Sequence, residues 1–544
     1  MVFNSLAFAL FFPAVLALYY GLPKRFQKWV LLGAGYAFYG VWDTRFLVLV
    51  SLSTVLDYCT GLMIAKGRMT LTQRLMPTAH LLGFTLLFLV CDWRAFQHDG
   101  GGFHFDAARF FAGDPLGIRI FLVAAAGVAI AHAAYPWLSR LPEATRRRFF
   151  LRASLVGQLG MLGFFKYYNF FIDSADEIAQ VFGTSAAALR LDIILPVGIS
   201  FYTFQTLTYV IDIYWRRMEP VEKLRDFALF ASYFPPLVAG PIERAAHLIP
   251  LLLGERRVSL DHFTRGSFLI LLGLLKKVAI ADSFAGTAAS VFQGTGHISF
   301  LDAWVGIVAF SIQVYGDFSG YSDIATGVSL FFGVQLMKNF DLPFFSTNPT
   351  EMWQRWHISL SSWLRDYLYI PLGGNRAGSR RTSINLFITM VVAGLWHGAN
   401  WTFVLFGAGH GISLILHRQF FPNAKRFEGS LLRRLPWMAL YFFGVWSVIG
   451  FFFPSPTVHR AFEAYDAWLT GFGGFGFNVK SPTASGLFAL PLLVAIEVAQ
   501  FQTKEVYVNR LLPPLLRGAF YALMIFFVVL GSSNEGQQFL YFQF

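Results

Sequence analysis

One histidine of this 544-residue chain has neighbours that make an ionisable side chain unusual. His397 is the single ionisable residue of the apolar stretch GLWHGANW, residues 394–401. A neutral imidazole still needs a hydrogen-bond donor and an acceptor, and burial disfavours its protonated form. A buried neutral histidine is suited to accept a proton from a hydroxyl group. His397 is therefore a candidate general base, and the alternative is a histidine that links two helices by hydrogen bonds.

The depth of His397 follows from the length of the apolar run around it. Residues 383–417 would form a single helix of about 52 Å, whereas the hydrocarbon core of a bilayer is about 30 Å thick. We therefore predict a broken helix over 383–417, interrupted where Gly394, Gly398 and Asn400 disturb the apolar pattern. Counted from Arg381, His397 lies roughly 24 Å along the axis, inside the membrane layer. Non-helical backbone and an ionisable group at that depth indicate a functional cavity.

A second histidine belongs to the longest stretch that is not a predicted span, residues 338–382. We interpret this stretch as an interfacial or re-entrant loop that contains an amphipathic helix, with Thr350 as its N-cap. At 100° per residue His357 falls on the aromatic face of that helix, together with Trp353, Trp356, Trp363 and Tyr367. The opposite face carries Arg355, Ser359, Ser362 and Asp366. His357 is either a satisfied interfacial group or part of a site, and the helix by itself favours neither.

Two further polar stretches carry weaker signals. In YGDFSGYSDIATG, residues 315–327, Asp317 and Tyr321 are expected to support a cavity wall or to belong to a turn between two spans. Residues 93–117 are polar and glycine-rich, which predicts a flexible loop inserted between spans. The histidines and aspartates of that loop match no strong metal-binding signature, so we expect no metal.

Composition places these residues in a membrane. Hydrophobic residues make up 56% of the chain and charged residues 14%, whereas soluble domains carry about 25% charged residues. We predict one all-α integral membrane domain over residues 1–544, with 11 to 14 crossings plus re-entrant pieces. The net charge of +12 is typical of basic cytoplasmic loops and does not indicate nucleic acid. No Walker loop and no GxSxG motif is present, which excludes a self-contained ATP motor and a hydrolase of that class.

Two long motifs around the histidines resemble a known family. NPTEMWQRWHISLSSWLRDYLYIPLGGNR (348–376) and NLFITMVVAGLWHGANWTFVLFGAGHG (385–411) are similar to the membrane-bound O-acyltransferases, in particular to their bacterial alginate O-acetyltransferase branch. Residues 195–214 and 235–244 support the resemblance, which extends over most of the chain. It implies a ring of tilted transmembrane helices around a thinned centre, with a tunnel that crosses the bilayer.

The resemblance also implies a reaction. His397 would match the catalytic histidine of the family, and His357 would match the family's second characteristic histidine. An acetyl group would pass from a cytoplasmic donor, acetyl-coenzyme A or another acyl donor, to an exported polysaccharide such as alginate or cellulose. Transfer would occur directly or through an extracytoplasmic acetyltransferase partner, in the bacterial inner membrane and without a bound cofactor. Residues expected to bind donor or substrate are Trp353, Arg355, Trp356, Arg365, Asn375, Trp396 and Asn400.

Several of these roles have alternatives. Trp396 and Asn400 are candidates to stabilise the oxyanion, while Arg355, Arg365 and Asn375 would contact the donor or anchor the interface. The same fold would also suit O-acetylation of peptidoglycan or D-alanyl transfer to teichoic acid. A different class is a transporter, which predicts a second broken helix in an inverted half, or an export-complex subunit without chemistry. We find one broken segment, around His397, which counts against a transporter.

Overall fold

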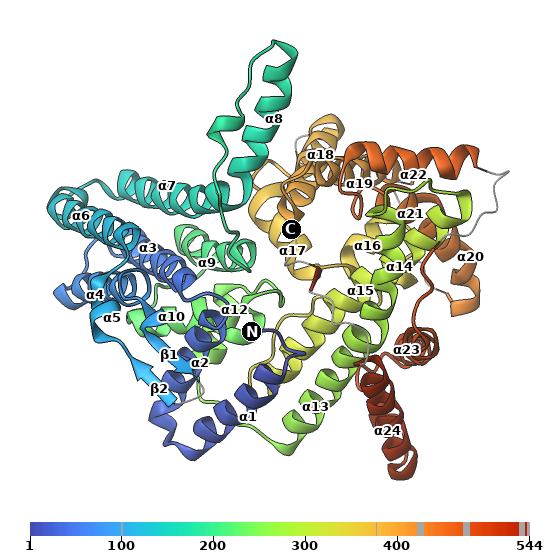
Figure 1. Ribbon diagram of the computed structural model, residues 1–544, viewed down its shortest axis with the longest axis horizontal. Helices are drawn as coiled ribbons and strands as arrows, with labels where there is room; N and C mark the ends of the chain where they lie inside the picture. The colour runs from blue at the N-terminus through green and yellow to red at the C-terminus, as the bar shows by residue number, and fades with distance from the viewer. Residues whose placement is uncertain (100–101, 377, 422–428, 472–478, 533–538, 541–544) are drawn as a thin grey trace. The chain divides into compact units, whose positions relative to one another are not determined.

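The computed structural model of the chain describes residues 1–99, 102–376, 378–421, 429–471, 479–532 and 539–540. Within these ranges the regular structure is helical apart from one two-stranded sheet, which confirms the predicted helical fold. The helices divide into two compact units (Figure 1). The first comprises residues 1–168, 191–238 and 243–257, and the second comprises residues 169–190, 239–242 and 258–544.

The first unit is built around one buried helix, α3. Its elements are α1 (Leu6–Gly21), α2 (Gln27–Gly40), α3 (Leu47–Ala65), α4 (Leu71–Thr85), β1 (Phe96–Asp99), β2 (Gly102–Phe105), α5 (Ala107–Ala112), α6 (Pro115–Leu138), α7 (Glu143–Leu162), α9 (Ile199–Tyr214), α10 (Leu224–Ser232), α11 (Phe234–Leu237) and α12 (Ala245–Leu253). Helices α4, α7 and α9 pack on α3. Ser154 and Gln158 of α7 donate hydrogen bonds of 2.6 and 2.7 Å to the buried carboxylate of Asp57 in α3.

The segment 93–117 is more ordered than a flexible loop. Strands β1 and β2 pair antiparallel, with Phe96 opposite Phe105, and the short helix α5 follows. The side chain of Asp106 caps α5 by accepting a hydrogen bond from the backbone N–H of Arg109. The glycines suggested a loop, but aromatic and alternating residues on both sides of them favour a hairpin.

The second unit contains both histidine motifs. Its helices are α8 (Tyr168–Val181), α13 (Leu260–Leu274), α14 (Asp282–Phe292), α15 (Phe300–Leu330), α16 (Pro349–Arg355), α17 (Ile358–Leu364), α18 (Gly378–His397), α19 (Trp401–Phe420), α20 (Leu431–Tyr441), α21 (Ser447–Gly450), α22 (Val458–Thr470), α23 (Ala484–Thr503) and α24 (Pro514–Gly531). A π-helical stretch, Leu275–Ala281, joins α13 to α14. Figure 1 shows α13 and α14 running beside α15.

Helix α15 corrects one expectation from the sequence. The sequence left open a turn between two spans at residues 315–327, but α15 continues through this stretch and has 31 residues. The aspartates of this stretch stay in the helix because nearby lysines neutralise their charges. Lys277 Nζ lies 2.7 Å from Asp317, and Lys276 Nζ lies 2.8 Å from Asp323. Lys277 also pairs with Asp282 at 2.8 Å.

A break separates α18 from α19. Helix α18 ends at His397 and α19 begins at Trp401, so the interruption falls within the predicted interval. The two helices touch backbone to backbone, since a Cβ added at Gly394 would lie 2.1 Å from the carbonyl oxygen of Phe403. A Cβ added at Gly407 would lie 2.3 Å from the carbonyl oxygen of Met390.

The single amphipathic helix predicted after Pro349 is wrong in two respects. Two short helices, α16 and α17, replace it, because His357 adopts a left-handed backbone conformation with φ of 42°. The N-cap is Asn348, whose side-chain oxygen accepts a 2.9 Å hydrogen bond from the N–H of Glu351, and not Thr350.

Five helical segments of the described residues are long and apolar enough to cross a membrane: 44–65, 71–90, 115–138, 484–503 and 514–531. The chain is therefore a multi-pass membrane protein. Helices α18 and α19, on either side of the break beside His397, have 20 residues each and are not among these five. The expected total of 11 to 14 crossings stays a prediction.

We expect Gly394→Ala to destabilise the hairpin that carries His397, because the added methyl group collides with backbone and not with a mobile side chain. Overpacking of this kind typically costs about 1–3 kcal/mol. The thermal stability of the detergent-solubilised protein measures it. Gly127→Ala in α6 is the control, since no atom lies within 4 Å of its added Cβ. Equal stability of the two variants would contradict the backbone contact.

Candidate active site

His397 is buried at the C-terminal end of α18. Its side chain is 3% exposed, and its ring centroid lies 5.2 Å from that of Phe453 and 6.1 Å from that of Phe406. The last turn of a helix carries partial negative charge from unpaired carbonyl groups. That charge favours the imidazolium that forms when the ring accepts a proton.

Asn400 stabilises the break that follows His397. Its side-chain oxygen accepts a 3.0 Å hydrogen bond from the N–H of Thr402 and caps α19. Its side-chain nitrogen donates a 2.9 Å hydrogen bond to the carbonyl oxygen of Pro456. Both polar ends of Asn400 are thus engaged in supporting the turn, a structural role that the sequence did not indicate. Its predicted contact with an oxyanion stays a prediction.

His357 lies close to His397. Its side chain is fully buried, and the two imidazole centroids are 6.4 Å apart. The Trp396 ring lies 5.5 Å from the centroid of His357 and 5.3 Å from that of His397. Phe318 of α15 packs edge-on against His357 at 4.5 Å. The structure therefore brings together the two histidines that the sequence singled out separately.

The backbone around His357 is held by Asn339. The carbonyl oxygen of Asn339 accepts a 2.8 Å hydrogen bond from the N–H of Ile358, and its side-chain oxygen accepts one of 2.9 Å from Ser359. Its side-chain nitrogen donates a 3.0 Å hydrogen bond to Ser322 of α15. A non-glycine residue with positive φ is strained and persists where its surroundings over-determine it. These bonds fix the imidazole of His357 relative to α15.

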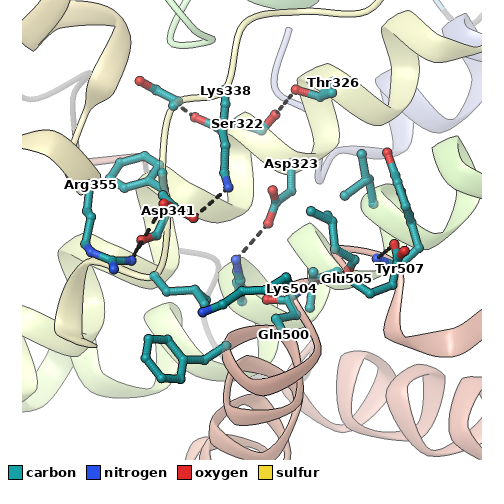
Figure 2. A pocket seen from close by; sticks show the side chains of 18 of the residues that line it. Ser322, Asp323, Thr326, Lys338, Asp341, Arg355, Gln500, Lys504, Glu505 and Tyr507 are labelled. Carbon is teal, nitrogen blue, oxygen red and sulfur yellow. Dashed lines mark hydrogen bonds and ion pairs between the residues drawn. The ribbon is translucent and has the colours of Figure 1, made fainter. Parts of the chain in front are cut away.

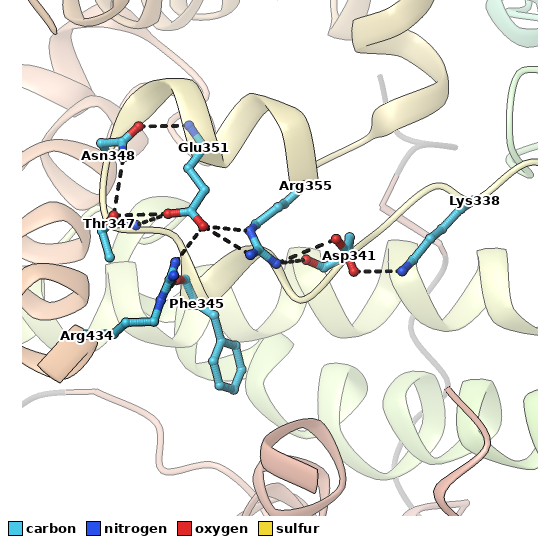
Figure 3. A network of polar contacts seen from close by, with 8 residues as sticks. All are labelled: Lys338, Asp341, Phe345, Thr347, Asn348, Glu351, Arg355 and Arg434. Atoms are coloured by element: carbon cyan, nitrogen blue, oxygen red, sulfur yellow. Dashed lines mark hydrogen bonds and ion pairs between the residues drawn. The ribbon is translucent and has the colours of Figure 1, made fainter. Parts of the chain in front are cut away.

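Arg355 is buried in a charge cluster, although the helical periodicity placed it on the polar face. Its guanidinium contacts Glu351 Oε1 at 3.0 Å and donates a 2.8 Å hydrogen bond to the carbonyl oxygen of Asp341. Arg434 approaches the same Glu351 oxygen at 2.5 Å and donates a 2.7 Å hydrogen bond to the carbonyl oxygen of Phe345. Figure 3 shows Glu351 between the two guanidinium groups. The cluster ties α16 and the preceding loop to α20.

The pKa of Glu351 reflects these opposing influences. Burial raises the pKa of this carboxyl. The hydrogen bonds from Arg434 and from the backbone of Thr347, together with the charges of both arginines, lower the pKa by more than burial raises it, so it lies below its usual value. Glu351 is therefore ionised at neutral pH. The cluster has two arginines around the carboxylate of Glu351. Arg355 also lies 3.6 Å from the carboxylate of Asp341, which partly balances its charge.

A small cavity of about 20 Å³ adjoins His397. Its walls come from α15, from the short stretch before α17, from α19 and from residues 446–453. They are Ile307, Phe310, Ser311, Val314, Trp356, His397, Phe406, Trp446, Gly450 and Phe453. Apart from His397 and Ser311 these walls are apolar or aromatic. A space of this size holds about one water molecule.

A much larger polar pocket, of about 900 Å³, lies in the same unit. Its rim and floor carry six cationic side chains: Arg265, Lys276, Lys338, Arg355, Arg434 and Lys504. Three carboxylates accompany them: Asp323, Asp341 and Glu505. Figure 2 shows Lys504 and Lys338 among the labelled residues around this pocket. Lys504 makes no ion pair within the described part of the chain, and its Nζ lies 4.2 Å from the ring centroid of Phe501.

One layer of aromatic rings lies between the two spaces. Tyr315 and Phe340 line the large pocket, and Trp356 lines the small cavity. The ring centroid of Trp356 is 5.2 Å from that of Phe340 and 6.2 Å from that of Tyr315. The hydroxyl of Tyr315 donates a 2.5 Å hydrogen bond to Glu497. We call Tyr315, Phe340 and Trp356 the aromatic partition.

The other predicted residues lie outside both spaces. Arg365 is exposed and pairs with Asp366 at 2.7 Å, and Asn375 is exposed after the π-helical turn Arg365–Tyr369. Trp353 packs against His410 with ring centroids 5.2 Å apart. Their predicted contacts with donor or acceptor stay predictions.

Asp317 and Tyr321 make buried contacts of their own, and their expected support of a cavity wall stays a prediction. Asp317 pairs with Lys277 and accepts a 2.7 Å hydrogen bond from the N–H of Leu540. The ring of Tyr321 lies 4.9 Å from that of Phe539. Both residues flank Phe318, the residue that contacts His357, on α15. They do not line either cavity.

Sequence reasoning missed the residues that shape the two spaces. Trp446 and Phe453 line the small cavity from a segment about 50 positions beyond His397, and Lys504 belongs to the turn after α23. His410 is also buried, and its ring centroid lies 4.6 Å from that of Phe406. In a chain with 62 phenylalanines no local pattern distinguishes an aromatic wall from ordinary packing.

Comparison with known proteins covers nearly the whole chain. The sequence profile of the membrane-bound O-acyltransferase family matches residues 221–455. The "Probable alginate O-acetylase AlgI" of Pseudomonas aeruginosa is 35% identical over 513 residues, which cover 94% of this chain and 83% of the relative.

Two relatives with other names match a shorter part. The "Peptidoglycan O-acetyltransferase" of Helicobacter pylori is 36% identical over 323 residues, covering 55% of this chain and 60% of the relative. The "Teichoic acid D-alanyltransferase" of Streptococcus thermophilus is 31% identical over 246 residues, covering 42% of this chain and 58% of the relative.

We expect Glu351→Gln to lower thermal stability at neutral pH, because two buried guanidinium groups lose their carboxylate. Removing one partner of a buried pair costs about 3–5 kcal/mol. Since the pKa of Glu351 is lower in the folded than in the unfolded state, its contribution is present at neutral pH and is lost as the pH falls through that lowered value.

The difference in melting temperature between wild type and Glu351→Gln should thus be largest near neutral pH and should narrow on acidification. The exposed Glu177, in the same unit, supplies the control Glu177→Gln, which should match wild type at each pH. A difference for Glu351→Gln that stays constant with pH would contradict the assigned ionisation.

Proposed function

This chain belongs to the membrane-bound O-acyltransferase family and is an O-acyltransferase, and on that premise we propose that it O-acetylates an exported polysaccharide. The acetyl group comes from a cytoplasmic thioester donor, acetyl-coenzyme A in the simplest case. The observation that carries the proposal is His397, a buried imidazole at a helix break beside a cavity and 6.4 Å from His357. The protein then lies in the bacterial inner membrane as a ring of tilted helices around a tunnel.

The reaction needs one base and one leaving group. His397 accepts the proton of the acceptor hydroxyl group. The oxygen of that hydroxyl attacks the thioester carbonyl carbon and forms the C–O bond. The C–S bond then breaks, and the imidazolium returns the proton to the leaving thiolate. The C-terminal carbonyl groups of α18 favour the transient positive charge on His397. His357 orients the acceptor, and Trp396, which contacts both imidazoles, directs its indole N–H toward the oxyanion.

The large polar pocket is the site we assign to the donor. Six cationic side chains and three carboxylates line it, and Glu351 and Asp261 offset part of the excess positive charge. The remaining excess, which includes Lys504, attracts an anionic ligand such as the phosphates of coenzyme A. Its volume of about 900 Å³ lies within the range of small-molecule sites, about 300–1,000 Å³. Arg355 and Lys504 belong to this pocket, so one predicted donor contact, Arg355, lies there.

The acceptor is an alginate-like or cellulose-like polymer in this proposal. It rests on the relatives named as alginate O-acetylases, which align over 94% of this chain. Peptidoglycan is the second candidate, since the Helicobacter pylori relative is 36% identical over a shorter alignment. Transfer to the polymer proceeds through an extracytoplasmic acetyltransferase partner or directly.

Replacing His397 tests the mechanism. We expect His397→Gln to lower ester-bound acetyl on the exported polymer by about 10²–10⁴-fold, the contribution of a general base, at an unchanged protein level in the membrane. The variant replaces the wild-type gene in the source organism, and acetyl released by mild alkali is measured.

The matched control is His459→Ala, because the His459 side chain is 85% exposed and lines neither cavity. Its polymer should carry the wild-type amount of acetyl. Full acetylation by His397→Gln would remove the imidazole from the mechanism. Acetyl lost from peptidoglycan, with the polysaccharide unchanged, would assign the second acceptor.

The donor site has a separate test. We expect Lys504→Asn to raise the KM for acetyl-coenzyme A about tenfold while kcat is unchanged, because a hydrogen bond to a charged group contributes about 1.5–3 kcal/mol. Asparagine is chosen because Lys504 has φ of 60°, a conformation that asparagine tolerates. Initial rates of thiol release are measured in membranes that contain the full chain.

Lys480→Asn serves as the control, since Lys480 is exposed and lies outside the pocket. The KM effect of Lys504→Asn should shrink as ionic strength rises. An unchanged KM would place the donor elsewhere.

A further inference from the structure

The cavity beside His397 is small and is lined mainly by bulky apolar side chains. Its volume is about 20 Å³, which suits one water molecule or one methyl group. Ile307 and Val314 lie two helical turns apart on one face of α15 and form one wall. Phe453 forms another wall, and its ring lies 5.6 Å from Phe310 and 5.0 Å from Phe406. Tightly packed interiors of this kind do not expand to admit larger groups.

We propose that this cavity selects the acyl group by length: it accepts the methyl group of an acetyl donor and excludes longer acyl chains. The inference rests on the proposed function of His397 and adds the residues that determine acyl specificity. These are Ile307, Val314 and Gly450, which line the same space as the imidazole.

The position of the cavity determines which part of the donor enters it. The attacked carbonyl carbon must lie within bonding reach of a hydroxyl that is itself hydrogen-bonded to His397. The acyl chain therefore begins next to the imidazole, and the space that adjoins the imidazole receives its first carbon. Proton transfer, C–O bond formation and C–S cleavage are the same for acetyl, propionyl and butyryl thioesters, so fit alone distinguishes them.

Gly450 contributes by lacking a side chain. A Cβ at this position would lie 3.1 Å from Cδ1 of Ile307, closer than an ordinary van der Waals contact. The side chain of Ile307 is itself fully buried and has little room to withdraw. An alanine at 450 would therefore reduce the space, whereas a smaller residue at 314 or 307 would enlarge it.

The walls are also independent of the charged donor pocket. None of Ile307, Val314 and Gly450 lines the 900 Å³ pocket, and the aromatic partition lies between the two spaces. Changes at these three positions should consequently alter acyl selection and leave recognition of the donor's anionic part intact.

The test measures competition between donors. Membranes containing the full chain receive an equimolar mixture of acetyl-, propionyl- and butyryl-coenzyme A, and the acyl esters formed on the polysaccharide are quantified by mass spectrometry. Wild type should prefer acetyl over propionyl by at least about tenfold, the discrimination that one methylene gives in an apolar pocket. Val314→Ala should raise the propionyl-to-acetyl ratio about tenfold.

Val328→Ala is the matched control. Val328 belongs to the same helix and is fully buried, but it lines neither cavity. Its product ratio should equal that of wild type. If Val314→Ala does not fold, Ile307→Val is the milder variant, because it removes one methyl group from the same wall. It should shift the product ratio in the same direction. Gly450→Ala should lower the acetyl rate and admit no propionyl.

The outcomes separate this inference from the proposed function. Folded Val314→Ala and Ile307→Val variants that transfer acetyl at the wild-type product ratio would overturn length selection by this cavity, while leaving His397 as the base. A wild-type protein that transfers no acyl group, or a His397→Gln variant that transfers it normally, would overturn the proposed function and this inference with it.

Discussion

The structure depends on a helix that ends inside an apolar protein, beside a second helix that begins there. Helix α18 stops at His397, where terminal carbonyl groups have no partner within the helix. The chain resumes as α19 three residues later, and Asn400 supplies both the cap of α19 and a hydrogen bond to Pro456. Backbone contact at Gly394 and Gly407 holds the two helices together. His397 is thereby placed at a dipole end and away from bulk water.

A second constraint is the strained backbone of His357. A left-handed histidine would relax into a continuous helix if its neighbours allowed it, because nothing in the flanking sequence forbids helix. Asn339 prevents this by binding the backbone on one side and Ser322 on the other. Glu351 and its two arginines then anchor the preceding turn. These hydrogen bonds and ion pairs hold the chain on both sides of His357 in place.

The sequence predicts what depends on length and periodicity. The helix break near His397 follows because 35 apolar residues exceed the bilayer thickness. Periodicity could not reveal the left-handed turn at His357, since residues on both sides keep a helical pattern. Helical periodicity placed Arg355 on a polar face. It could not show that Arg355 is buried in a cluster with Glu351 and Arg434, because Arg434 lies 83 positions beyond Glu351. Likewise, the lysines that keep α15 continuous past Asp317 lie about 40 residues earlier.

The two spaces on either side of the aromatic partition differ in the way that the two ends of an acyl thioester differ. One is large and positively charged; the other is apolar, water-sized and adjoins His397. A single pocket able to bind an anionic carrier would also admit water to the thioester, and hydrolysis would compete with transfer. Trp356, packed against Phe340 and Tyr315, lies between the charged space and the space beside His397. In the proposed reaction, this separation would let different residues determine affinity for the carrier and selectivity for its acyl group.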